Sequence, residues 1–130
     1  MTLPIHHLTL TVSNRDESAK WLQDLFGKAD VRDREGQGYK RYVMRWPGGL
    51  WLGITEHENS VNGSKFSHLN IGMDHVGLLC ENKAELENWV KKLDALDYEH
   101  GPIEEEPTYW AVTSRTPDNI PIEFYCFKET

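Results

Sequence analysis

The chain has 130 residues, a mass of 15.1 kDa and a formal net charge of −7 at pH 7. This length is typical of one globular domain, and the acidic balance argues against a general nucleic-acid or anionic-membrane binder. No apolar run approaches the roughly 20 residues of a membrane span and no signal peptide is recognisable, so we expect a cytoplasmic protein.

Residues 5–12 alternate in character, which predicts a half-buried strand. The side chains on the face toward a core are Leu8, Leu10 and Val12. Those on the other face are His7, Thr9 and Thr11. A helix is predicted next, because Asn14 is a typical N-cap, Glu17 completes a capping box and Gly27 suits a helix end. Short strands follow, with turns at 35–38 and 47–49.

The same plan returns in the second half of the chain, where the first strand is expected over residues 73–80. Sliding the sequence along itself until His7 falls on His75 also places Asn14 on Asn82. After a short insertion in the second copy, Gly53 falls on Glu123. We therefore predict an α+β fold in a single domain, 1–130, made of two βαβββ repeats whose curved mixed sheets are backed by helices. The repeats span about 3–56 and 73–127, and a polar linker, 57–72, joins them.

His7, His75 and Glu123 fall on the strand faces that the predicted helices leave uncovered. If the two sheets curve toward each other, these three side chains converge. Two imidazoles and one carboxylate suit a divalent metal ion with open coordination positions, which can polarise a substrate oxygen or activate water. Fe, Mn, Ni, Co and Zn all accept this set of ligands. The alternative is that both histidines are ordinary polar residues on an exposed strand face.

The same alternation gives a set of candidate substrate-binding residues: Thr9, Trp51, Thr55, Leu79 and Tyr125. Their mostly neutral and aromatic character predicts an uncharged or aromatic ligand rather than a polyanion. Lys40, Arg41 and Arg45 are the only basic residues expected nearby on a strand, so no cationic cluster for a phosphonate is predicted. Trp51 has a second interpretation, as a surface residue covered by a loop or by a second subunit.

Three segments, in register with the duplication, resemble the vicinal oxygen chelate superfamily. They are residues 7–14 with the following helix and its Leu25-Phe26-Gly27 end, the second start Asp74-His75-Val76, and the closing segment 116–124. This superfamily includes glyoxalase I, fosfomycin-resistance thiol transferases, extradiol dioxygenases and bleomycin-resistance proteins. The resemblance implies that His7, His75 and Glu123 are metal ligands, and that the metal chelates a substrate through adjacent oxygens.

One departure from the family pattern bears on the reaction. Glyoxalase I has a further acidic ligand on its fourth strand, where this chain has Gly53. By strand alternation, Glu56 should face the helix side or lie outside the strand. The resemblance therefore implies a metal-dependent lyase, isomerase, transferase or dioxygenase that acts on a small oxygen-bearing molecule, and not a true glyoxalase I. The alternative is a metal-free protein that sequesters an antibiotic or another small molecule. A homodimer is expected in either case.

Overall fold

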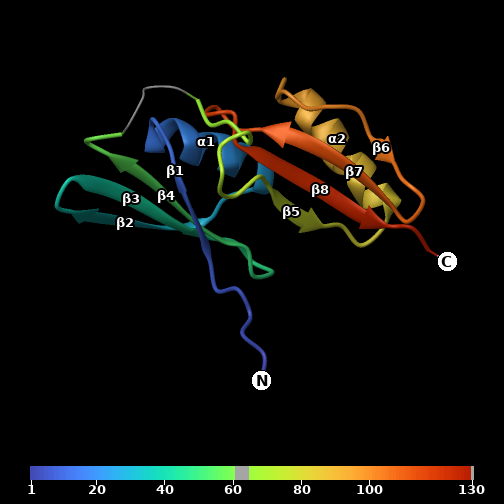
Figure 1. Ribbon diagram of the computed structural model, residues 1–130, viewed down its shortest axis with the longest axis horizontal. Helices are drawn as coiled ribbons and strands as arrows, with labels where there is room; N and C mark the ends of the chain where they lie inside the picture. The colour runs from blue at the N-terminus through green and yellow to red at the C-terminus, as the bar shows by residue number, and fades with distance from the viewer. Residues whose placement is uncertain (61–64, 130) are drawn as a thin grey trace. The chain divides into compact units, whose positions relative to one another are not determined.

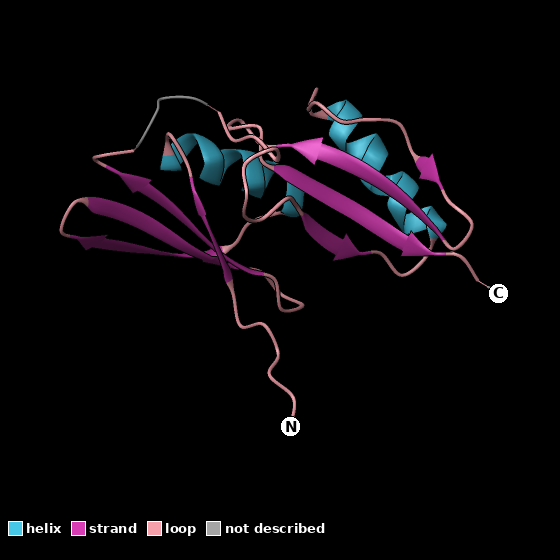
Figure 2. Ribbon diagram, viewed as in Figure 1, coloured by secondary structure: helices cyan, strands magenta, loops and turns pink. Residues whose placement is uncertain are grey.

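The computed structural model describes residues 1–60 and 65–129 (Figures 1 and 2). The chain divides into two compact units, Met1–Ser64 (unit 1) and Lys65–Thr130 (unit 2). Each unit contains one helix and one four-stranded sheet, in the order βαβββ, which confirms the predicted α+β fold. Positions 61–64 of the predicted linker lie outside the described residues.

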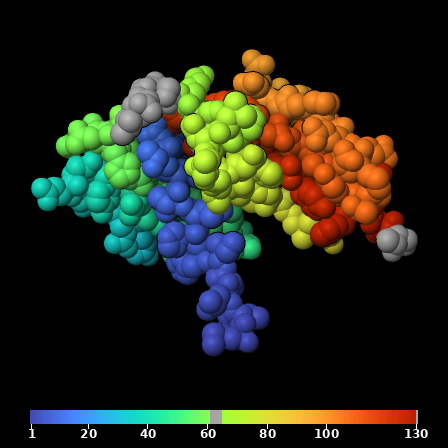
Figure 3. Space-filling view, viewed as in Figure 1, coloured from blue at the N-terminus to red at the C-terminus, as the bar shows by residue number. Residues whose placement is uncertain are grey.

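Unit 1 contains β1 (Leu8–Thr11), α1 (Arg15–Phe26), β2 (Asp30–Gly36), β3 (Tyr39–Arg45) and β4 (Trp51–His57). Its sheet has the strand order β1-β4-β3-β2, in which β1 and β4 are parallel and the other pairs are antiparallel. The segment before β1 extends away from the rest of unit 1 (Figure 3).

Unit 2 contains β5 (Val76–Leu79), α2 (Lys83–Ala95), β6 (Glu104–Glu105), β7 (Tyr109–Arg115) and β8 (Pro121–Phe127). The sheet order β5-β8-β7-β6 repeats that of unit 1, again with one parallel pair. The two registers also match, because Thr9 pairs with Gly53 in unit 1 and Gly77 pairs with Glu123 in unit 2.

The first strand of each unit is shorter than the sequence predicts. The strand expected from Ile5 begins at Leu8, which is paired with Leu52, and the strand expected from Met73 begins at Val76, which is paired with Ile122. Each first strand pairs only with the last strand of its unit, and β4 and β8 start at Trp51 and Pro121. In this register, positions 5–6 and 73–74 would lie opposite residues that precede β4 and β8, so the ladder cannot extend that far.

Both helices begin as predicted, with an asparagine N-cap. The Oδ1 atom of Asn14 accepts the Glu17 N–H at 3.0 Å, and Oδ1 of Asn82 accepts the Glu85 N–H at 2.9 Å. At the other end of α1, Gly27 has a φ of 91°, a conformation that glycine adopts without strain. The caps thus fix where each helix starts relative to the strand before it.

Each unit has its own apolar core between helix and sheet. The buried apolar side chains of unit 1 include Leu10, Leu22, Leu25, Met44, Leu52 and Ile54. Those of unit 2 include Leu86, Leu93, Val112, Ile122, Phe124 and Cys126. Cys80 is also buried, which raises the pKa of its thiol to about 11 and keeps it protonated near neutral pH. In the part of the chain that the structure describes, no helix has the length and apolar character that a bilayer crossing requires.

Candidate functional site

His75 and Glu123 lie together in unit 2. The Nε2 atom of His75 is 3.7 Å from Oε2 of Glu123. His75 directly precedes β5, and Glu123 is the β8 residue paired with Gly77. The next β8 residue, Phe124, stacks on Trp89 of α2, so Glu123 points to the opposite, helix-free face of the sheet. The structure therefore brings two of the three predicted metal ligands onto one face.

Asp74 holds the other nitrogen of the His75 ring. Its Oδ1 atom lies 2.7 Å from Nδ1 of His75, and this hydrogen bond lowers the pKa of the Asp74 carboxyl group. The contact directs Nε2 of His75 toward Glu123. A carboxylate on the non-ligating nitrogen is the usual arrangement for a histidine that binds a metal. The sequence contained Asp74 in the Asp74-His75-Val76 segment, but nothing in the strand pattern assigned it a role.

His7 belongs to unit 1, where it directly precedes β1 and is exposed. Its Nδ1 atom lies 2.8 Å from Nδ1 of His6, so one of these two atoms carries the hydrogen and the other accepts it. Both predicted histidine ligands are therefore held through Nδ1 by the residue that precedes them. Among the described residues of either unit, no three His, Cys, Asp or Glu side chains form a set that could hold a metal ion.

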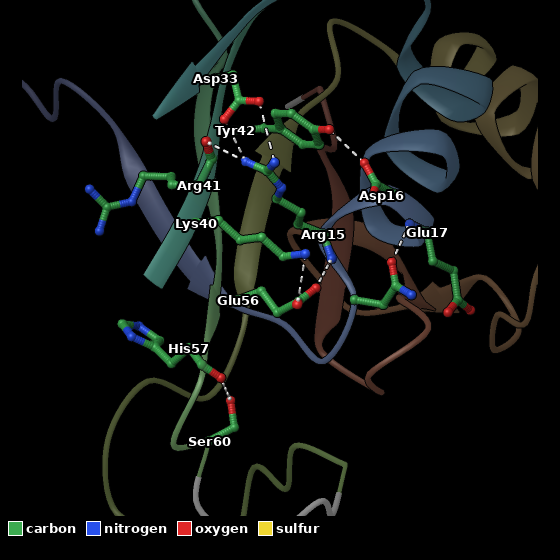
Figure 4. Close-up of polar contacts among 11 residues, drawn as sticks. Arg15, Asp16, Glu17, Asp33, Lys40, Arg41, Tyr42, Glu56, His57 and Ser60 are labelled. Carbon is green, nitrogen blue, oxygen red and sulfur yellow. Dashed lines mark hydrogen bonds and ion pairs between the residues drawn. The ribbon is translucent and has the colours of Figure 1, made fainter. Parts of the chain in front are cut away.

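Position 53 and Glu56 are the two places on β4 from which a further carboxylate ligand of a metal could come. A Cβ atom added to Gly53 would lie 2.8 Å from Oγ1 of Thr9, so the Thr9 side chain already fills that space. Glu56 lies on the helix side of β4, as its strand position predicts. Its Oε1 atom accepts the Arg15 N–H at 3.0 Å, and its Oε2 atom is 3.3 Å from Nζ of Lys40 (Figure 4). These contacts lower the pKa of Glu56.

The five predicted substrate-binding residues lie on the helix-free faces, in different surroundings. In unit 1, Trp51 lines a groove, whereas Thr55 is only 1% exposed and its hydroxyl accepts the Nε–H of Arg41 at 2.7 Å. In unit 2, Leu79 is 68% exposed, and the Tyr125 ring stacks on Tyr109 with 4.7 Å between centroids. Thr9, the fifth residue, is exposed.

The expectation that Lys40, Arg41 and Arg45 are the only basic residues near this face is wrong. Arg32 and Arg34 of β2 share the helix-free face with Arg41 and Arg45 of β3, whereas Lys40 points to the helix side. The sequence pattern of β2 did not reveal this face, because Val31 is the only large apolar residue of the strand and all its residues are exposed. A basic surface therefore exists where a neutral lining was predicted.

A polar network on the other face of the unit 1 sheet attaches α1 to β2 and β3 (Figure 4). The Arg15 guanidinium group is 2.8 Å from Oδ1 of Asp33 and lies 4.0 Å from the centroid of the Tyr42 ring. The Tyr42 hydroxyl donates to Oδ1 of Asp16 at 2.5 Å, and this bond raises the pKa of Tyr42. These contacts are internal to the unit, so we assign the network a structural role.

The chain matches one protein family along most of its length. The model of the Glyoxalase/Bleomycin resistance protein/Dioxygenase superfamily matches residues 4–124, and the chain belongs to this superfamily. The match confirms the resemblance found in the sequence. No curated protein matches this sequence.

Solved structures of several proteins share the fold. A glyoxylase/bleomycin resistance protein/dioxygenase domain from Frankia sp. EAN1pec is 24% identical, with a TM-score of 0.89 over 99% of this chain and 95% of that chain. A glyoxalase family protein from Enterococcus faecalis is 18% identical, with a TM-score of 0.78 over 94% of this chain and 96% of that one. The fosfomycin resistance protein FosX from Listeria monocytogenes, complexed with Mn(II) and sulfate, is 19% identical, with a TM-score of 0.70 over 97% and 93% of the two chains.

Proposed function

We propose that the protein is a metal-dependent enzyme that acts on a small oxygen-bearing molecule, with His7, His75 and Glu123 as the ligands of one divalent ion. The observation that carries this proposal is the arrangement in unit 2, where Nε2 of His75 faces Glu123 at 3.7 Å while Asp74 holds Nδ1. Two imidazoles and a carboxylate suit Fe, Mn, Ni, Co or Zn and leave coordination positions free. The Mn(II) complex of FosX, which shares the fold, supports a divalent ion in this chain.

Asp74 and Glu123 have distinct roles in this proposal. When bound, a divalent ion supplies Lewis-acid polarisation of a substrate oxygen. Asp74 accepts a hydrogen bond from His75 and fixes the orientation of that ring, and Glu123 supplies the negative charge of the ligand set. Of the five predicted substrate contacts, Thr9, Trp51, Leu79 and Tyr125 remain candidates. Thr55 does not, because its side chain is buried.

The proposed reaction is of lyase, isomerase, transferase or dioxygenase type. A proton transfer between adjacent carbons, as in glyoxalase I, requires a carboxylate base close to the reacting atoms. Gly53 leaves no such group on β4, and Glu56 is bound to Arg15 and Lys40 on the helix side of the sheet. We therefore expect thioester formation from methylglyoxal and glutathione to be absent or very weak with any of the metals named above.

The direct test is the metal content of protein purified without chelator or added metal. We expect one divalent ion per chain in the wild type, and a large loss of metal in each of the variants His7→Ala, His75→Ala and Glu123→Gln. His57→Ala is the matched control, because His57 is an exposed histidine at the end of β4 and should retain full metal. Full metal content in His75→Ala by elemental analysis would contradict the proposal.

A metal-free binding protein is the second candidate. It is favoured by the aromatic surface on the helix-free face of unit 2, where Tyr125 stacks on Tyr109 and meets the Phe127 ring edge-on at 5.1 Å between centroids. Stacked rings of this kind bind planar organic molecules without a metal. Under this alternative, His75→Ala would bind its aromatic ligand as tightly as the wild type does, whereas Tyr125→Ala would not.

A further inference from the structure

Four of the six arginines in the chain lie on the helix-free face of the unit 1 sheet. They are Arg32, Arg34, Arg41 and Arg45. In the β2–β3 register, Arg34 is directly opposite Arg41, Arg32 is opposite Val43, and Arg45 is opposite Asp30. The four side chains therefore form one array across two neighbouring strands.

The contacts of the intervening residues show which face this is. Asp33 of β2 pairs with Arg15 of α1, and Tyr42 of β3 donates to Asp16 of α1, so both point toward the helix. Successive strand residues point to opposite faces, which places Arg32, Arg34 and Arg41 on the side away from α1. Figure 4 shows the Arg41 side chain leaving β3 in the direction opposite to α1.

The acidic residues of β2 offset the charge of the array only in part, because Asp30 alone among them shares its face. Within residues 1–60 and 65–129, none of the four arginines forms an ion pair, although the chain has 21 acidic residues. Of the acidic residues of β2, Asp33 and Glu35 alternate onto the helix side, whereas Asp30 lies on the face of the array, opposite Arg45, without forming an ion pair with it. Like charges directly opposite each other in a sheet are destabilising, so Arg34 opposite Arg41 costs stability in the free protein. An anionic ligand would offset that cost.

A groove accompanies the array. Its volume is about 250 Å³, and its lining residues are Asp30, Arg32, Arg34, Val43, Arg45 and Trp51. The Arg45 guanidinium group lies 5.1 Å from the centroid of the Trp51 ring. Arg41, beside the groove, is held by the Thr55 hydroxyl, and its guanidinium group lies 4.8 Å from the centroid of the Tyr39 ring. Two of the four guanidinium groups are thus positioned in advance by neighbouring side chains.

We propose that this arginine face binds a small organic anion. Its phosphate, phosphonate or carboxylate group would be held by Arg32, Arg34 and Arg45, and its organic part would lie against Val43 and Trp51. A guanidinium fork can donate two hydrogen bonds to one oxyanion, which makes arginine well suited to such groups. The inference rests on the proposed function only in identifying this anion as the substrate, since anion binding itself requires no metal.

The test is calorimetric titration of the full chain, treated with chelator, with phenylphosphonate, benzoate and the neutral analogue benzamide. We expect phenylphosphonate, benzoate or both to bind, and benzamide to bind much more weakly. In Arg32→Gln/Arg34→Gln, affinity for the anions should fall by about tenfold or more, because hydrogen bonds to two charged groups are lost. Both residues are exposed on an edge strand, so this variant should fold, which a thermal melt verifies.

The control variant Lys65→Gln/Lys91→Gln removes the same charge from exposed positions of unit 2 and should bind the anions as the wild type does. If the β2 variant does not fold, Arg45→Gln takes its place. Equal affinity in the β2 variant and the wild type, equal binding of benzamide and benzoate, or no binding of either anion would each overturn the proposal. His75→Ala should leave anion affinity unchanged, so failure of the metal proposal and failure of this one are separate results.

Discussion

The pair Gly53 and Thr9 shows how a side chain on one strand limits which side chains fit at the facing position of the next strand. They are cross-strand partners, and a Cβ on Gly53 would lie 2.8 Å from Oγ1 and 3.1 Å from Cγ2 of Thr9. In unit 2 the roles are exchanged, with Gly77 on the first strand and Glu123 on the last. A Cβ on Gly77 would be 3.6 Å from Oε1 of Glu123, which is an ordinary contact.

Gly53→Ala should therefore destabilise the protein by about 1–3 kcal/mol, since the added methyl group forces Thr9 or the backbone to move. Urea unfolding monitored by circular dichroism measures the change. Gly77→Ala is the matched control and should change stability far less. Thr9→Gly should relieve the effect of Gly53→Ala in a double-mutant cycle, and additive effects of the two changes would refute the steric explanation.

At the scale of elements, one ionic contact links α2 to the segment that precedes β6. Nε2 of His100 lies 2.6 Å from Oδ1 of Asp94, and Nδ1 of the same ring is 2.7 Å from the carbonyl oxygen of Gly101. The hydrogen bond with Asp94 is the main reason why the pKa of His100 is raised above its ordinary value. Protonated His100 is therefore more stable in the folded chain than in the unfolded one.

This contact predicts a pH dependence of stability. Since the folded-state pKa of His100 is raised, its contribution is fully present below the ordinary histidine pKa and is lost as the pH rises through the raised value. Asp94→Asn should remove this contribution, which we expect to be about 0.5 kcal/mol because the Asp94 carboxylate is largely exposed. Urea unfolding between about pH 5.5 and 8.5 tests it. Glu99→Gln, a nearby exposed change, should leave the pH profile as it is, and an unchanged profile in Asp94→Asn would refute the assignment.

The elements also show what the sequence could predict. The repeat and its asparagine caps predicted both helices, the βαβββ order of elements along each copy and the face of Glu123, because caps and apolar alternation are local signals. The starts of β1 and β5 depend on where β4 and β8 begin, which no local pattern encodes. The arginine face was missed because β2 is exposed along its whole length, so its register with β3 had to come from the structure. The role of Asp74 was also missed, because a strand pattern does not tell whether this side chain points toward the His75 ring.

At the scale of the whole molecule, exposed apolar residues favour assembly. Leu3 and Ile5, in the segment before β1, are 87% and 80% exposed. Leu79 and Phe127 are large, exposed apolar residues of unit 2. Where such residues form a contiguous patch on a soluble protein, the patch often marks a site at which a partner binds. We therefore propose a homodimer, as the superfamily resemblance also implies.

Light scattering at micromolar concentration should give the mass of a dimer. The variant Leu3→Ser/Ile5→Ser should weaken the dimer, because it removes apolar surface from a segment that extends away from the rest of unit 1 (Figure 3). Thr2→Ser, in the same segment, is the control and should remain dimeric. A monomeric mass for the wild type at these concentrations would rule out the proposed assembly.

The exchanged glycines of the two sheets also limit how such a protein can evolve. At the cross-strand position shared by Thr9–Gly53 and Gly77–Glu123, each unit carries one side chain and one glycine. A carboxylate side chain at position 53 would crowd Thr9, so we expect it to destabilise the sheet while Thr9 remains. If Thr9 is replaced by glycine first, the intermediate protein has two glycines opposite each other. Such a pair costs only modest stability. We therefore expect position 9 to change before position 53 in any descendant of this chain that gains an acidic side chain at position 53.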